Sequence, residues 1–207
     1  LLAWWPLDDT TSSTAVDASG NGHHAKVNGT TSCKGRVGRG ARRFDGSGFL
    51  EVADMGPHDA VSISLWLRTD SLNSRWNPLL FFDEGQAGAM HFSLLPNGTP
   101  NVAVNTGDWN WTHSNGHISL GDGKWHHLAL VCDPRLGGSV QFYVDGRVAG
   151  RNLVSLGIPL DLYGFRIGGW NRWEATPASN FHGEIDDIRI YSGSLTSEQT
   201  TELAEEG

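Results

Sequence analysis

The chain has 207 residues, including 27 glycines and 9 tryptophans, and its formal net charge is −8. A chain of this length can bury a large core without a disulfide or metal, and an all-β sandwich of this size is commonly one domain. The one basic run, residues 34–43, is interleaved with glycine. Nucleic acid is therefore excluded as a partner, because phosphate binding needs clustered Lys and Arg. The longest apolar run is far short of the ~18 residues of a membrane span, so we expect none.

Short apolar segments follow one another in chain order, separated by turns rich in Gly, Asn and Asp. Residues 61–69 show the clearest period of two, with apolar side chains alternating with Ser and other residues, as in a strand of a sandwich. We expect strands at residues 1–7, 41–45, 49–53, 61–69, 79–83, 90–95, 101–105, 122–132, 139–146, one closing within 165–173, and 181–191.

Only the tail predicts a helix. Thr196 and Gln199 fit a capping box, Leu203 offers an apolar contact, and Gly207 can end the helix. The two cysteines, Cys33 and Cys132, lie far apart; Cys132 ends an apolar run and fits a buried position, while a disulfide between them stays open. The sequence therefore predicts one all-β domain over residues 1–207 with a short C-terminal helix.

The last predicted strand, residues 181–191, carries Glu184, Asp186 and Asp187 within four positions. Such a cluster fits either a catalytic carboxylate pair or a site for a hard cation. The alternative is plain surface charge. The choice between these interpretations decides whether the sequence encodes an enzyme or a binding module.

Several segments together resemble the LamG-like (concanavalin A-like) family, which includes laminin G domains, pentraxins and legume lectins. The segments that carry the resemblance are residues 5–8, 17–22, 38–46, 61–67, 125–130, 142–146, 183–191 and 195–199. The resemblance implies a two-sheet antiparallel jelly-roll sandwich in which the first and last strands are adjacent.

The resemblance also implies one structural calcium ion between the loop at residues 17–22 and the last strand. Calcium takes six to eight oxygen ligands from carboxylates, amides and loop carbonyls, and both segments are rich in these. The alternative is that these residues only form turns and solvated surface. The expected side-chain ligands are Asp8, Asp17, Asn21, Asp186 and Asp187.

Hydrolases that share this fold carry Glu-x-Asp-x-Glu on one strand, and Glu184-Ile-Asp186 is similar to its first half only. Ile188 stands where the second carboxylate would be, so no acid/base and nucleophile pair can be drawn. A lyase using His91 or His113 with Arg75 is an alternative that no spacing singles out. We therefore expect the domain to be non-catalytic.

Sugar recognition uses aromatic faces for stacking and nearby amide or charged groups for hydroxyls. Three clusters outside the periodic core positions offer this chemistry, at residues 75–77, 108–113 and 170–174, although tryptophans in loops can also simply cover the sandwich ends. The tryptophans at positions 4, 5, 66 and 125 are assigned to packing. The candidate ligand-binding residues are Arg75, Trp76, Asp108, Trp109, Asn110, Trp111, His113, Trp170, Asn171, Arg172 and Trp173.

These observations predict a non-catalytic carbohydrate-binding, lectin-like module with a structural calcium ion. We expect it to belong to a larger secreted or cell-surface protein that acts on glycans, of bacterial origin and covalently linked to other domains. Its partner would be a polysaccharide or glycan, and an acidic one fits Arg75, Arg172 and His113. The alternative function is adhesion or protein recognition, as in laminin-type relatives.

Overall fold

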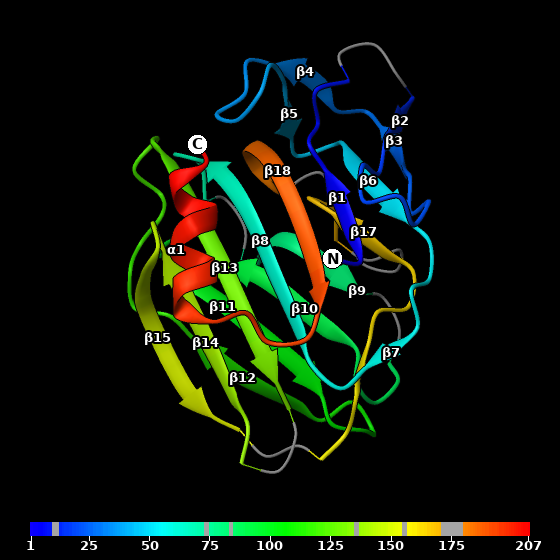
Figure 1. The fold of residues 1–207 in the computed structure, drawn as a ribbon, viewed down its shortest axis with the longest axis vertical. Coiled ribbons are helices and arrows are strands. Elements are labelled where there is room, and N and C mark those ends of the chain that lie inside the picture. The colour runs from blue at the N-terminus through cyan, green and yellow to red at the C-terminus, as the bar shows by residue number, and fades with distance from the viewer. Residues whose placement is uncertain (10–12, 73–74, 83–84, 135–136, 155–156, 171–179) are drawn as a thin grey trace.

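The structure is a computed structural model that describes residues 1–9, 13–72, 75–82, 85–134, 137–154, 157–170 and 180–207. Within these residues, the strands form two eight-stranded antiparallel sheets that pack face to face, plus a two-stranded ribbon (Figure 1). The predicted jelly-roll sandwich is confirmed. None of the helical segments in the described ranges has the length and apolar character needed to cross a bilayer.

The first sheet contains the longest strands and carries the C-terminal helix on its outer face (Figure 1). In spatial order it consists of β15 (Arg147–Leu153), β14 (Ser139–Val144), β13 (Trp125–Asp133), β8 (Val61–Arg68), β18 (His182–Ser192), β5 (Ala41–Asp45) and β4 (Thr31–Cys33), with β1 (Ala3–Trp5) also paired to β18.

The second sheet lies on the other side of the core. In spatial order it consists of β12 (Trp111–Asn115), β11 (Pro100–Asn105), β10 (Met90–Leu94), β9 (Asn77–Phe82), β17 (Phe165–Ile167), β6 (Phe49–Val52), β3 (Ala25–Asn28) and β2 (Thr14–Ala15). The separate ribbon pairs β16 (Leu160–Asp161) with β7 (Pro57–His58).

The two ends of the chain meet in the first sheet. β1 runs antiparallel to β18, with Ala3 opposite Ile190 and Trp5 opposite Ile188. Helix α1 (Ser197–Glu205) follows directly, and its capping box is present: Thr196 accepts a hydrogen bond from the Gln199 amide, and the Gln199 side chain accepts one from the Thr196 amide. Both features were predicted.

The structure has strands where none was expected. The longer ones are β3, β12 and β15, and β4 is a further one in the first sheet. The face of β8 that carries Ser62 and Ser64 is also buried, beneath the C-terminal segment. There Ser62 donates a hydrogen bond to Gly193 O, and Ser64 contacts His127. Both cysteines are free, and Cys132 is fully buried as predicted.

Candidate functional site

Strand register builds a pocket on the outer face of the second sheet, the face turned away from the core. His91 on β10 lies opposite Ala103 on β11, which lies opposite His113 on β12. Alternation along each strand puts Ser93, Asn101 and Trp111 on the same face. The hollow measures about 200 Å³, and we call it the aromatic pocket; its lining is Trp76, His91, Ser93, Asn101, Ala103, Trp111, His113 and Trp170.

Ring stacking fixes the walls of the aromatic pocket. His91 stacks between Phe81 and Trp111, with ring centroids 3.6 Å and 4.0 Å away. Trp170 lies against Phe81 at 4.2 Å, and its amide donates to Asn180 Oδ1 at 2.7 Å. Each ring is therefore held by a neighbour before any ligand arrives, which lowers the entropy cost of binding.

Trp76 forms the opposite wall. Its ring stacks on His113 at a centroid distance of 5.5 Å, and the Arg75 guanidinium lies 5.5 Å from the centroid of the Trp76 ring. Ala103 lies between the two histidines in the register, and its small side chain leaves the depression between them.

Polar groups lie at the floor of the aromatic pocket. Asn101 is 2 % exposed and donates to Asn115 Oδ1 at 2.7 Å. Ser93 is 1 % exposed, and its hydroxyl has no hydrogen-bond partner in the described part of the chain. A buried hydroxyl without a partner costs free energy, and a ligand hydroxyl in the pocket could relieve that cost.

Both histidines of the aromatic pocket have a lowered pKa, which favours the neutral imidazole at pH 7. Burial lowers the pKa of His91 to about 3. Burial, and then the charge of Arg75, lowers the pKa of His113. A neutral imidazole has one donor and one acceptor nitrogen, which suits hydroxyl groups better than a fixed anion.

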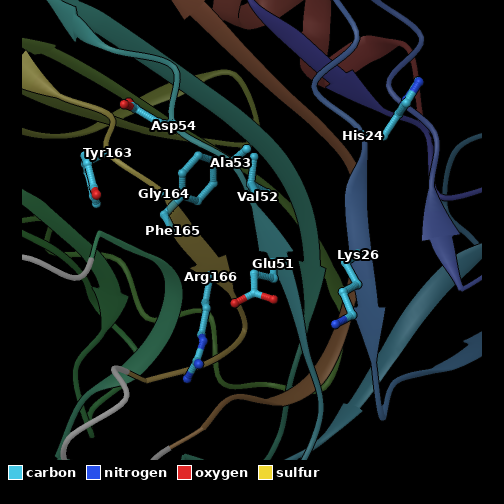
Figure 2. A pocket seen from close by; sticks show the side chains of 10 residues that line it. All are labelled: His24, Lys26, Glu51, Val52, Ala53, Asp54, Tyr163, Gly164, Phe165 and Arg166. Carbon is cyan, nitrogen blue, oxygen red and sulfur yellow. The ribbon is translucent and has the colours of Figure 1, made fainter.

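A second hollow, of about 480 Å³, lies across the same sheet where β3, β6 and β17 run side by side (Figure 2). Charged side chains line it, among them Lys26, Glu51 and Arg166, and we call it the charged pocket. The outer face of the second sheet therefore carries two pockets.

A family model described as the concanavalin A-like lectin/glucanases superfamily matches residues 44–200. The chain belongs to this superfamily. The predicted resemblance is thus confirmed, and the match includes strands of both sheets, although β1 to β4 lie outside it. No curated protein sequence matches the chain at a significant level.

Solved structures with the same superfamily fold include domain 4 of AbnA, a GH43 extracellular arabinanase from Geobacillus stearothermophilus, in complex with arabinotriose. It is 25 % identical with a TM-score of 0.74, and the alignment covers 99 % of this chain and 98 % of that domain. The binding domain of Paraclostridial Mosquitocidal Protein 1 has a TM-score of 0.76 at 15 % identity, over 98 % of this chain and 51 % of that one.

The ligand binding domain of botulinum neurotoxin serotype D, in complex with N-acetylneuraminic acid, has a TM-score of 0.75 at 13 % identity. That alignment covers 99 % of this chain and 50 % of the toxin domain, so the chain spans about half of each toxin domain. The two toxin domains show the shared fold alone.

On this superfamily fold, the structure brings together residues from all three predicted tryptophan clusters. Trp76, Trp111, His113 and Trp170 line the aromatic pocket, and Arg75 lies over Trp76. Sequence reasoning missed Ser93, Asn101 and Ala103 and did not single out His91 for binding. Their signal was present, since they occupy alternate positions of predicted strands where an apolar core residue is not required.

Other predicted ligand-binding residues lie elsewhere. Asp108, Trp109 and Asn110 form the tip of the β11–β12 hairpin, with positive φ angles of 50° at Asp108 and 60° at Trp109. Trp109 is 69 % exposed, and its ring covers Gly85 rather than the aromatic pocket. The predictions for Asn171, Arg172 and Trp173 fall outside the described residues.

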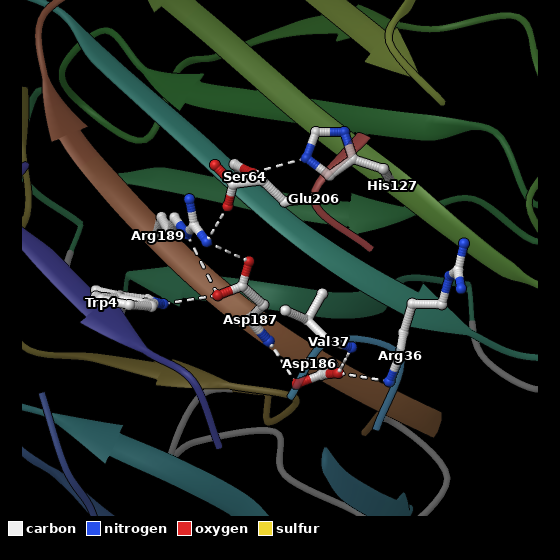
Figure 3. Close-up of polar contacts among 9 residues, drawn as sticks. All are labelled: Trp4, Arg36, Val37, Ser64, His127, Asp186, Asp187, Arg189 and Glu206. Atoms are coloured by element: carbon white, nitrogen blue, oxygen red, sulfur yellow. Dashed lines mark hydrogen bonds and ion pairs between the residues drawn. The ribbon is translucent and has the colours of Figure 1, made fainter. Parts of the chain in front are cut away.

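The carboxylates of β18 are engaged by the protein itself (Figure 3). Asp186 is fully buried and accepts hydrogen bonds from the amides of Arg36 at 2.7 Å and Val37 at 2.8 Å. Burial raises the pKa of Asp186 to about 6. Asp187 accepts from Trp4 Nε1 at 2.6 Å and pairs with Arg189 at 3.0 Å. These contacts join β18 to β1 and to the loop before β5.

The first loop uses its carboxylates in the same way. Asp17 accepts from the amides of Trp4, Ser19 and His23 and from the Ser19 hydroxyl, at 2.8–2.9 Å. Asp8 accepts from the amides of Arg39 at 2.5 Å and Gly40 at 2.7 Å. Partial burial acts to raise the pKa of Asp17, but the hydrogen bonds that Asp17 accepts from Ser19, Trp4 and His23 hold that pKa below its usual value.

The five predicted calcium ligands do not form one oxygen cage in this arrangement. N–H and O–H groups point at the Asp17, Asp186 and Asp187 oxygens, where a cation would have to lie, and Asn21 turns its amide nitrogen to Leu2 O at 2.8 Å. Among the described residues, no group of three or more His, Cys, Asp or Glu side chains could hold a metal ion. The calcium site stays a prediction.

Glu184, the remaining carboxylate of β18, is 5 % exposed and lies between two arginines. Arg43 Nη2 contacts one of its oxygens at 2.7 Å, and Arg68 Nε contacts the other at 2.6 Å. Ile188, in the position of the missing second carboxylate, is fully buried in the core. Glu184 therefore acts as the centre of a structural ion pair network.

Proposed function

We propose that this chain is a non-catalytic carbohydrate-binding module and that the aromatic pocket binds the sugar. The observation that carries the proposal is the pocket itself, in which indole and imidazole rings surround a buried hydroxyl and amide. Pyranose and furanose rings present C–H groups to aromatic faces and hydroxyls to polar groups, so one pocket can satisfy both.

The solved structure of the arabinanase domain with arabinotriose supports the proposal, because it aligns over nearly the full length of both chains. By the same reasoning, we place the module outside the cell, within a larger protein that acts on glycans. Laminin-type adhesion to a protein is the competing function, and the aromatic pocket favours it less because its polar groups are few and enclosed.

A glycan array probed with the wild type and with Ala103→Leu tests the proposal. Leucine would fill the space between His91 and His113 and exclude a sugar ring, so we expect binding to be lost. Ala103 is on the outer face but only 3 % exposed, so melting curves must first show that Ala103→Leu is folded; Val148→Leu, at an exposed position outside the pocket, is the control for array signal. Equal array signals for wild type and Ala103→Leu would reject the aromatic pocket as the site.

The predicted structural calcium ion has its own test. A bound ion stabilises the folded state, so the melting temperature should fall when a chelator is added and recover with excess calcium. An unchanged melting temperature would reject the ion without affecting the proposed sugar site.

A further inference from the structure

A continuous row of outer-face residues connects the two pockets of the second sheet. Each member is paired with the next across neighbouring strands. Neighbouring strands lie ~4.8 Å apart, so the six steps of the row span about 29 Å. The row consists of Lys26, Glu51, Arg166, Phe81, His91, Ala103 and His113.

The charged pocket exists because small residues follow this row. Ala53 lies two positions after Glu51 and Gly164 two positions before Arg166, just outside the ends of β6 and β17, and both line the hollow. A Cβ atom at Gly164 would meet Val52 O at 3.4 Å and Asp54 N at 3.8 Å, which is ordinary contact. Gly164 therefore contributes no side chain that would fill the hollow it lines.

Arg166 is held in place between the two pockets. Its guanidinium lies 4.2 Å from the Phe49 ring centroid, and its Nη1 donates to Trp170 O at 3.0 Å. The side chain of the same Trp170 lines the aromatic pocket. Trp170 thus forms part of the wall of the aromatic pocket and also holds the guanidinium of Arg166, which lines the charged pocket.

The charges of the charged pocket balance. Two cations, Lys26 and Arg166, line this pocket together with two anions, Glu51 and Asp54. Figure 2 shows Glu51 beside Arg166. A ligand with a fixed charge would meet repulsion from one pair, whereas hydroxyl groups can donate to the carboxylates and accept from the cations. Tyr163 is 45 % exposed at the rim and adds an aromatic surface.

We propose that the charged pocket is a second sugar subsite, so that the module binds a neutral polysaccharide along its chain rather than only at its end. This inference rests on the proposed function of the aromatic pocket. A chain crossing the strands would place separate sugar units in the two pockets, and the effective concentration of the second unit would raise the affinity.

Calorimetric titration with a length series tests the inference. The probes are arabinotriose and linear arabino-oligosaccharides of increasing length, with cello- and xylo-oligosaccharides and acidic oligogalacturonides in parallel. For the wild type, we expect a neutral series whose affinity rises by about tenfold or more once the chain reaches the charged pocket, since hydrogen bonds to charged groups are worth 1.5–3 kcal/mol each.

Two variants should remove this gain. Gly164→Val adds bulk above the pocket floor at a position without strain, and Tyr163→Ala removes the rim ring; with either, longer chains should bind no more tightly than short ones. Trp109→Ala, which removes a more exposed aromatic ring outside both pockets, should keep the gain. Melting curves confirm that each variant is folded.

The outcomes separate the two proposals. Binding that is lost in Ala103→Leu but does not rise with length in the wild type would overturn the second subsite and leave the aromatic pocket in place. A preference for oligogalacturonides would overturn the neutral chain. If the wild type binds neither these oligosaccharides nor any glycan on the array, both proposals fail.

Discussion

At the scale of single residues, the aromatic pocket depends on which ring faces it. Trp109 and Trp111 are two positions apart, and both were predicted to bind sugar, yet only Trp111 lines the pocket. Trp109 belongs to a hairpin tip with positive φ, whereas Trp111 begins β12 with its ring on His91. Sequence reasoning found the tryptophans but could not separate them, because a two-residue difference decides between tip and strand.

The pair offers a matched test. Trp111→Ala should weaken glycan binding by tenfold to a hundredfold, since stacking on a sugar face and the support of His91 are lost together. Trp109→Ala should leave the affinity unchanged. Calorimetry with the strongest array glycan measures both, and equal losses in the two variants would contradict the assignment.

The protonation states of His91 and His113 lead to a second prediction at this scale. Because burial lowers the pKa of His91 to about 3 and also lowers the pKa of His113, His91 stays neutral and His113 stays mainly neutral between pH 8 and about 6.5. Glycan affinity should therefore be constant over that interval. An affinity that changed tenfold between these pH values would show that one of them titrates in the site.

At the scale of elements, β18 joins segments that are far apart in the sequence. It pairs with β1, β5 and β8, and Asp187 accepts a hydrogen bond from the indole of Trp4. Adjacency of the first and last strands followed from the family resemblance. The network around Asp187 did not, because it depends on a bulge between Asp186 and Arg189 that places a positive φ of 44° at Asp187.

Trp4→Phe tests the contribution of this contact. The substitution keeps an aromatic ring but removes the N–H donor to a buried carboxylate, so the free energy of unfolding should fall by about 1–3 kcal/mol. Urea denaturation measures the change, with Trp109→Phe at an exposed position as the control. If Trp4→Phe lowered the free energy of unfolding by less than the control variant does, the Asp187 carboxylate would need only its ion pair with Arg189.

The missed strands also have a physical explanation at this scale. β12 has the sequence Trp-Thr-His-Ser-Asn, which lacks an apolar alternation because one of its faces lines the aromatic pocket and the strand lies at the edge of the sheet. β8, in contrast, was predicted over its full length because its core-facing residues are all apolar. Strands that form sites are therefore harder to predict than strands that form core.

At the scale of the whole molecule, buried neutral histidines couple stability to pH. Burial lowers the pKa of His127 to about 4 and that of His91 to about 3, against 6.5 in the unfolded chain. Between pH 6.5 and 4 the unfolded state binds more protons, so stability falls as the pH falls. Asp186, with a pKa raised to about 6, opposes this because its folded form binds a proton more tightly.

Two histidines outweigh one carboxylate in this balance. Each histidine should cost about 2 kcal/mol of stability on going from pH 7 to pH 5, and Asp186 should return about 1 kcal/mol. Urea midpoints at the two pH values measure the net loss, and an Asp186→Asn variant should show a larger loss than the wild type. A protein equally stable at both pH values would contradict the neutral, buried state of His91 and His127.

The central claim, that the aromatic pocket binds a glycan, is tested most directly by the indole N–H signals of the nine tryptophans. A two-dimensional NMR spectrum of the labelled protein, recorded while the strongest array glycan is added, reports on each of them. If the aromatic pocket binds the glycan, the signals of Trp76, Trp111 and Trp170 shift with one saturating curve while those of Trp4, Trp66 and Trp109 stay in place. Shifts at Trp109 without shifts at Trp76 and Trp111 would contradict it.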